Sequence, residues 1–144
     1  MEEIKCSEFK PGRHFMGKMP HGKCILKSIE NFCIEKKINM ATFSLIGAVS
    51  CAHIGFYDQN KREYLKHQKN EEFEILKCSG NISLKDDKPF VHAHIILADK
   101  NDNAIGGHLF YDTIIFAGEI FIQELIGKPC SRTYDNITGL YLWR

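Results

Sequence analysis

Residues 89–109 read PFVHAHIILADKNDNAIGGHL, and this stretch predicts the fold around it. Side chains of an extended strand alternate between two faces, so His92 and His94 share one face while the apolar residues around them share the other. Residues 99–103, DKNDN, are typical of a turn and lie between two strand-like segments. We therefore predict a hairpin with a five-residue loop centred on Asn101.

Folding the chain about Asn101 places His94 opposite His108. Directly opposed residues of an antiparallel pair hold their Cβ atoms about 4.5–5.5 Å apart on one face, which is close enough for both rings to reach one ion. A register slip of one residue would turn His108 to the other face. The pairing is therefore a structural prediction.

Three histidines on one face predict a metal site. Neutral imidazole is the commonest zinc ligand, and three histidines with one open position are typical of catalytic zinc, whose coordinated water has a pKa of about 7. We predict zinc at His92, His94 and His108, with space beside Gly106-Gly107 for the ion or a ligand. An H-x-H pair alone is also common as ordinary packing on a half-exposed strand, and the third histidine favours the metal.

No residue is predicted as a fourth ligand. The nearby carboxylates are candidate general bases or partners of a ring nitrogen, and no spacing rule selects one. They are Glu72, Glu74 and Asp112. The remaining histidines have no such partners and are interpreted as solvent-exposed or packing residues: His14, His21, His53 and His67.

Composition predicts one cytoplasmic domain over residues 1–144. A chain of 144 residues with 44% hydrophobic residues can bury one core. No apolar run is long enough for a bilayer, and the charged start MEEIKCSEFKPGR lacks the apolar segment of a signal peptide. The six cysteines are scattered without a C-x-x-C pair, so we interpret them as free thiols.

The charge balance argues against a general affinity for nucleic acid. Nineteen basic and 18 acidic residues leave a formal charge of +1, whereas a phosphate-binding domain usually shows a clearly basic face. One basic segment, residues 61–69 (KREYLKHQK), is a candidate patch. Lysines that protect an exposed strand edge from pairing explain this segment better.

Hydrophobic periodicity predicts one main helix and several strands. The apolar residues Ile25, Ile29 and Cys33 recur at helical spacing, so residues 24–37 are expected to form an amphipathic helix. A first strand over 3–10 is expected to end at Pro11-Gly12, before a loop over 17–22. Further strands are expected over 41–46, 51–57, 63–69, 71–78, 81–84, 114–116 and 119–125, the last two separated by a bulge at Gly118, and over 137–143 docked in the sheet. The predicted fold class is α+β, a mainly antiparallel sheet of about seven strands with the helix packed on it.

Short motifs run through nearly the whole length of the chain: Ile46-Gly-Ala-Val-Ser50, Gly55-Phe-Tyr-Asp58 with Glu63-Tyr64, Phe73-Glu-Ile-Leu76, Ser79-Gly-Asn-Ile-Ser83, Phe90-Val-His-Ala-His94, Gly106-Gly-His-Leu109 and Thr138-Gly-Leu-Tyr-Leu-Trp143. In these motifs, their order and their spacing the chain resembles the plants-and-prokaryotes-conserved (PPC) family, which is often labelled a DNA-binding domain. The resemblance implies a single α+β domain that forms a homotrimer, with a metal, usually zinc, at His92, His94 and His108.

Two functional hypotheses follow. The first is a regulatory or binding module, a zinc-containing homotrimer that recognises a small ligand or a protein. DNA is a weaker candidate partner, because the Arg-Gly-Arg-Pro hook that grips DNA in plant relatives does not occur here and Glu72 replaces the basic residue of the plant interaction motif. The alternative is a zinc-dependent hydrolase or lyase acting on a small substrate, which needs a general base and a pocket beside the metal.

Overall fold

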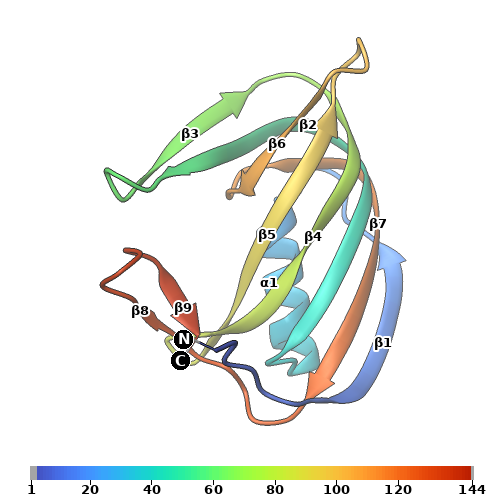
Figure 1. Ribbon diagram of the computed structural model, residues 1–144. Coiled ribbons are helices and arrows are strands. Elements are labelled where there is room, and N and C mark those ends of the chain that lie inside the picture. The colour runs from blue at the N-terminus through green and yellow to red at the C-terminus, as the bar shows by residue number, and fades with distance from the viewer. Residues whose placement is uncertain (1–2, 144) are drawn as a thin grey trace.

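The structure is a computed structural model that describes residues 3–143, and its centre is a seven-stranded antiparallel sheet (Figure 1). The sheet order is β1-β7-β2-β4-β5-β6, and β3 pairs with β2. The strands are β1 (Lys10–Lys18), β2 (Ala41–Asp58), β3 (Glu63–Lys69), β4 (Phe73–Lys85), β5 (Lys88–Ala98), β6 (Ala104–Leu109) and β7 (Ile114–Ile126). A separate hairpin pairs β8 (Arg132–Tyr134) with β9 (Tyr141–Trp143). The α+β class with about seven sheet strands is confirmed.

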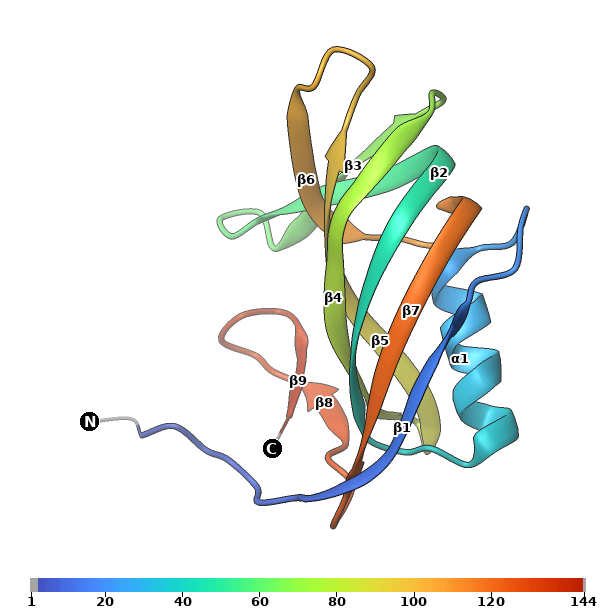
Figure 2. The ribbon, with the colours of Figure 1, turned by 90° about the vertical axis from the view of Figure 1, so that its right-hand side faces the viewer.

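The predicted helix is confirmed as α1 (Ile25–Lys36). Its apolar stripe, Ile25, Ile29 and Cys33, is almost completely buried against the sheet. The helix ends where Lys37 adopts a left-handed φ of 57°, and the N–H of Ile38 donates to the Cys33 carbonyl at 2.8 Å. Figure 2 shows α1 on one side of the sheet and the β8–β9 hairpin on the other. The two faces of the sheet therefore have different roles, and the core lies on the α1 side.

Strand β2 is one long, bent strand, where two strands over 41–46 and 51–57 were predicted. Its first half pairs with β4 and β7, and its second half pairs with β3 and β6. Gly47 has a φ of 144°, and a Cβ there would lie 2.2 Å from the Ala117 carbonyl oxygen. Because β-bulges flank this glycine, the strand bends without losing its pairing. The bend brings Gly55 opposite His108 and closes β2, β4, β5 and β6 into a ring.

The prediction for the N-terminal segment was wrong. Residues 3–9 form no regular element, and β1 includes Pro11-Gly12, where a strand end was expected. This strand lies at the sheet edge, has β7 as its one partner within residues 3–143, and changes register between Pro11 and His14. An edge strand with a bulge tolerates the missing N–H of proline. The predicted loop over 17–22 begins later, at Met19.

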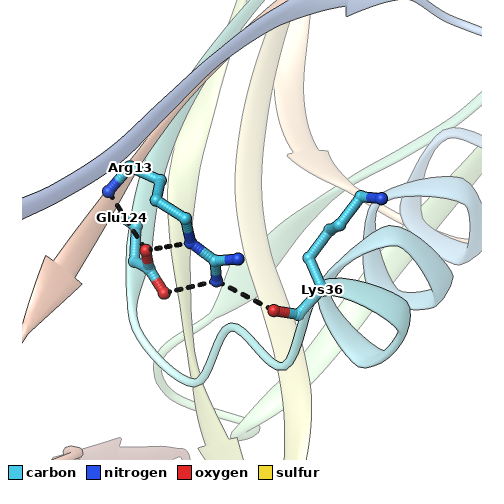
Figure 3. Close-up of polar contacts among 3 residues, drawn as sticks. All are labelled: Arg13, Lys36 and Glu124. Atoms are coloured by element: carbon cyan, nitrogen blue, oxygen red, sulfur yellow. Dashed lines mark hydrogen bonds and ion pairs between the residues drawn. The ribbon is translucent and has the colours of Figure 1, made fainter.

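Arg13 fastens this edge strand to the sheet and to the helix (Figure 3). Its Nε and one terminal nitrogen donate to the two carboxylate oxygens of Glu124 in β7 at 2.7 and 2.8 Å. The same terminal nitrogen donates to the carbonyl of Lys36, the last residue of α1, at 2.8 Å. Glu124 is only 6% exposed, and its pKa lies below the usual value chiefly because Arg13 donates to it. One bidentate pair therefore joins three elements.

Two other strands are longer than predicted, and the C-terminal strand lies elsewhere. β4 runs unbroken through Gly80, where a break was expected. β7 is also one strand, and its register shift against β2 lies between Ile115 and Ala117, whereas the bulge was expected at Gly118. Residues 137–143 were predicted to dock in the main sheet, but only Tyr141–Trp143 are extended, and they pair with β8. In a short window, the alternation of residues ends at a glycine. The hydrogen bonds between neighbouring strands nevertheless continue past a small residue, so β4 and β7 are longer than the alternation indicates.

The six cysteines are free thiols, as predicted, with Cys24, Cys33 and Cys78 buried. No helix within residues 3–143 is long and apolar enough to cross a membrane.

Candidate metal centre

The predicted β5–β6 register is confirmed, with His94 directly opposite His108. The ring centroids lie 5.2 Å apart for His92 and His94, 5.2 Å for His92 and His108, and 5.6 Å for His94 and His108. One potential ligand atom from each ring lies within 4.8 Å of the other two. Within the described part of the chain this is the one cluster of three or more His, Cys, Asp or Glu residues placed to share an ion.

The backbone around the three histidines is packed too tightly for side chains at three glycines. A Cβ at Gly107 would lie 2.5 Å from the Gly55 carbonyl oxygen, and one at Gly80 would lie 2.0 Å from that of His92. A Cβ at Gly106 would lie 2.6 Å from the Ile95 carbonyl oxygen. These close approaches place β2, β4, β5 and β6 in contact around the cluster, so the histidines sit on a rigid scaffold.

The environment keeps two of the three rings neutral at pH 7. Burial lowers the pKa of His92 to about 4, with further contributions from the charges of Arg132 and His94. Burial also lowers the pKa of His108 to about 4, followed by the effects of the other two histidines and of Lys66. A neutral imidazole offers a lone pair to a metal, whereas an imidazolium does not. A set of three nitrogen donors on a closely packed scaffold fits zinc.

Two aromatic residues that sequence reasoning missed orient His108. The rings of Tyr64 and Phe110 pack against it with centroids 4.7 and 4.8 Å away. The Tyr64 hydroxyl also lies 3.5 Å from Nδ1 of His108, a long contact. Tyr64 belongs to β3, so its approach depends on the bend of β2. One feature of the sequence indicated a role for Tyr64, its place in the Glu63-Tyr64 motif of the family resemblance.

A cavity of about 450 Å³ adjoins the cluster and is lined by His92 and His108. Its other walls include residues of β3 and of the β8–β9 hairpin. Arg132 of β8 is 9% exposed and lines the cavity, with Asn81 and Ser83 of β4 as hydrogen-bond partners. The site is therefore a group of metal-type ligands beside a space of small-molecule size.

The structure does not bring the candidate general bases to the histidines. Glu72 and Glu74 line a different recess together with Asp99, and Asp112 lines a third one near His53. Among residues 3–143, Glu63 is the one carboxylate that lines the cavity beside the cluster. The interpretation of His14 and His21 as solvent-exposed or packing residues agrees with their exposure and with their edge-on contacts to Phe121 and Phe116.

Residues 6–126 match the Plants and Prokaryotes Conserved (PCC) domain, the family abbreviated PPC above. The chain belongs to this family. Three solved structures of similar proteins agree with the assignment. A metal-containing protein of Archaeoglobus fulgidus is 45% identical, with a TM-score of 0.94 and coverage of 98% of this chain and 99% of that one. A plant- and prokaryote-conserved protein of Pyrococcus horikoshii is 35% identical, with a TM-score of 0.93 and coverage of 98% and 97%.

A third similar structure is that of a protein of Bacteroides thetaiotaomicron, described as a candidate DNA-binding protein. It is 27% identical, with a TM-score of 0.83 and coverage of 94% of this chain and 96% of that one. Among curated proteins, the bifunctional protein GlmU of Synechococcus sp. (strain JA-3-3Ab) is 28% identical over 120 residues. The match covers 82% of this chain but only 18% of that protein, so the PPC chain spans about a fifth of its relative's length.

Proposed function

We propose that this PPC protein is a zinc-binding homotrimeric module that recognises a ligand in the cavity beside His92, His94 and His108, and that its role is regulatory. The observation that carries the proposal is the convergence of the three imidazoles, with ligand atoms within 4.8 Å, next to a cavity of about 450 Å³. The Archaeoglobus fulgidus relative, described as metal-containing, supports it. When bound, zinc would supply a Lewis acid that can hold a donor atom of the ligand.

Metal analysis of untagged protein tests the metal half of the proposal. We expect close to one zinc per chain, loss of the ion in the double variant His92→Ala/His108→Ala, and retention in the control His67→Ala, which lies exposed on β3. An anomalous scan across the zinc edge on a crystal would identify the element and its ligands. Protein without a stoichiometric ion, together with unchanged stability of the double variant, would contradict the metal site.

The trimer is supported by the family resemblance and by the open face of the sheet. Opposite α1, the apolar side chains of Met16, Ile46 and Phe121 are 85%, 53% and 39% exposed. Association with further copies would remove such surface from water. Sedimentation equilibrium is expected to give three times the chain mass of 16.6 kDa. Phe121→Glu is expected to dissociate the assembly, and Ile137→Glu, on an exposed turn, should leave it intact. A monomeric wild type would contradict the trimer.

Direct DNA binding is the second candidate, because the Bacteroides relative is described in those terms. Two observations weigh against it. The formal charge is +1, and β3, which carries the basic segment, lies at a sheet edge where lysines prevent unwanted pairing. Lys66 of that segment lies over the Phe110 ring and lines the cavity. Affinity for duplex DNA that falls steeply with salt would support this candidate, and a flat response would contradict it.

The alternative of a zinc-dependent hydrolase or lyase needs a general base within reach of the substrate. Glu63 is the one carboxylate lining the cavity among the described residues, and it is exposed. Glu72, Glu74 and Asp112 lie elsewhere. The geometry therefore favours binding over hydrolysis.

A further inference from the structure

Arg132 is a buried cation whose hydrogen-bond partners are all neutral. Its Nε donates to Ser83 Oγ at 2.9 Å, and its two terminal nitrogens donate to Asn81 Oδ1 at 2.8 Å and to the Tyr141 carbonyl at 3.1 Å. Within residues 3–143 no carboxylate lies within ion-pair distance of it. A buried charge without a counter-charge is costly, and two of the five guanidinium N–H groups remain for a further acceptor.

The remaining charged groups of the cavity reinforce the positive sign. Lys66, Lys85 and Arg62 also line it, against the one carboxylate of Glu63. The Lys66 ammonium lies 4.7 Å from the Phe110 ring centroid, and the Lys85 ammonium lies 3.8 Å from that of Tyr141. No carboxylate of the described chain pairs with these three cations. Cations that line one recess with a single opposing carboxylate give it a positive potential that attracts anions.

The walls also define the body of a ligand. Phe90 and Tyr141 line the cavity, and the Arg132 guanidinium lies 5.4 Å from the Phe90 ring centroid. A volume of about 450 Å³ lies in the range of small-molecule sites. Aromatic walls favour a flat apolar body, while the cations favour an anionic group.

We propose that this cavity binds a small organic anion, a carboxylate or phosphate on a flat apolar body, with Arg132 as its counter-charge. Both head groups present the paired oxygens that a guanidinium recognises. The proposal deepens the ligand-binding role stated above and rests on it for the adjacent histidines, but the charge argument does not require the metal.

Titration with three probes tests the anion site. Benzoate and phenyl phosphate carry the two head groups, and benzamide is a neutral molecule of the same shape as benzoate. Binding can be followed by calorimetry and by the fluorescence of Trp143, the single tryptophan, whose ring centroid lies 5.2 Å from the Arg132 guanidinium. We expect at least one anion to bind at least tenfold more tightly than benzamide, and the tighter of the two identifies the head group.

Matched variants show whether the cavity is the binding site. Lys66→Gln and Lys85→Gln are each expected to weaken anion binding severalfold, while Lys69→Gln, on the same strand as Lys66 but outside the cavity, should not. Arg132→Gln is expected to weaken it at least tenfold. Because Arg132 also ties β8 to β4, Arg132→Lys, with its fold verified by thermal melting, provides a second measurement, and a loss of affinity is expected there too.

The titrations are run on metal-free and on zinc-loaded protein, so that the two proposals can fail separately. Anion binding in protein that never takes up zinc would support this inference and contradict the metal site. Zinc uptake without binding of either anion would do the reverse. Binding of both benzoate and phenyl phosphate no tighter than that of benzamide, or unchanged affinity for the tighter anion in Lys66→Gln, Lys85→Gln and Arg132→Lys, would overturn the anion site.

Discussion

His94 and His108 face each other across the β5–β6 hairpin, with ring centroids 5.6 Å apart. The turn between them explains this register. Asp99 Oδ1 accepts from the backbone N–H of Asn101 at 2.8 Å and of Asn103 at 3.0 Å, and Asp102 adopts a left-handed φ of 64°. Side-chain bonds of this kind stabilise one loop conformation, so the loop length decides which residue lies opposite His94.

Gly107→Ala is expected to disturb the cluster without touching a histidine. A Cβ at this position would lie 2.5 Å from the backbone carbonyl oxygen of Gly55, so β2 and β6 must separate beside His108. We expect a loss of about 1–3 kcal/mol in the free energy of unfolding, typical of overpacking, and weaker zinc retention. Urea unfolding and metal analysis measure the two effects.

Gly17→Ala is the matched control, because a Cβ there meets nothing within 4 Å. It should leave stability and metal content nearly unchanged. Equal effects of the two substitutions would show that close packing at Gly107 does not position His108.

The β5–β6 hairpin could be predicted because the residues that determine it lie close together in the sequence. Alternation places His92 and His94 on one face, and the turn residues 99–103 set the register with His108. The amphipathic helix could be predicted for the same reason, since its period is visible within a short window. The three histidines therefore follow from the sequence before any coordinates are known.

The cavity could not be predicted, because its walls come from distant parts of the chain. Arg132 donates a hydrogen bond to Asn81, which lies 51 residues earlier in the chain, and the local sequence around neither residue predicts this contact. Tyr64 reaches His108 only because β2 bends beyond Gly47, and a run of small residues indicates close packing without giving the direction of a bend. We interpreted the small residues 47–50 as the end of a strand, and for this reason two strands were predicted in place of β2.

The metal-free protein is expected to lose stability as the pH falls from 6.5 toward 4. Burial holds the pKa of His92 and His108 at about 4 in the folded chain, against 6.5 for an unperturbed ring. Within this window the unfolded chain takes up protons that the folded chain does not, so acid favours unfolding. Above pH 6.5 these two groups cause no further change.

Urea unfolding at several pH values measures this dependence. His92→Asn/His108→Asn should flatten the slope between pH 6.5 and 4, and His67→Asn, exposed on β3, should not. Zinc-loaded protein should show a steeper loss because protons compete with the ion for the same nitrogens. Identical slopes for the wild type and the double variant would contradict the assignment.

Glu124→Gln is expected to lower the free energy of unfolding by about 1.5–3 kcal/mol, the range for hydrogen bonds to charged groups. The substitution removes the charge that accepts two bonds from the Arg13 guanidinium at 2.7 and 2.8 Å. Arg13→Lys should also destabilise, because an ammonium cannot bridge both carboxylate oxygens and the Lys36 carbonyl in the same way. Glu119→Gln, exposed on the same strand as Glu124, is the control, and an equal loss there would contradict the role of the pair.

Five of the six thiols are expected to react in an order set by their burial. Cys33 and Cys78 are fully buried, and burial raises the pKa of each to about 12, so little reactive thiolate is present at pH 8. Cys6 is exposed and should react first with a disulfide reagent, followed by the partly exposed Cys51 and Cys130. Peptide mass mapping after timed labelling measures the order, and Cys6→Ser should remove the fast phase. Cys33 and Cys78 should be labelled only when urea unfolds the chain. If they react in native protein at the rate of Cys6, the core between α1 and the sheet opens far more readily than its packing implies.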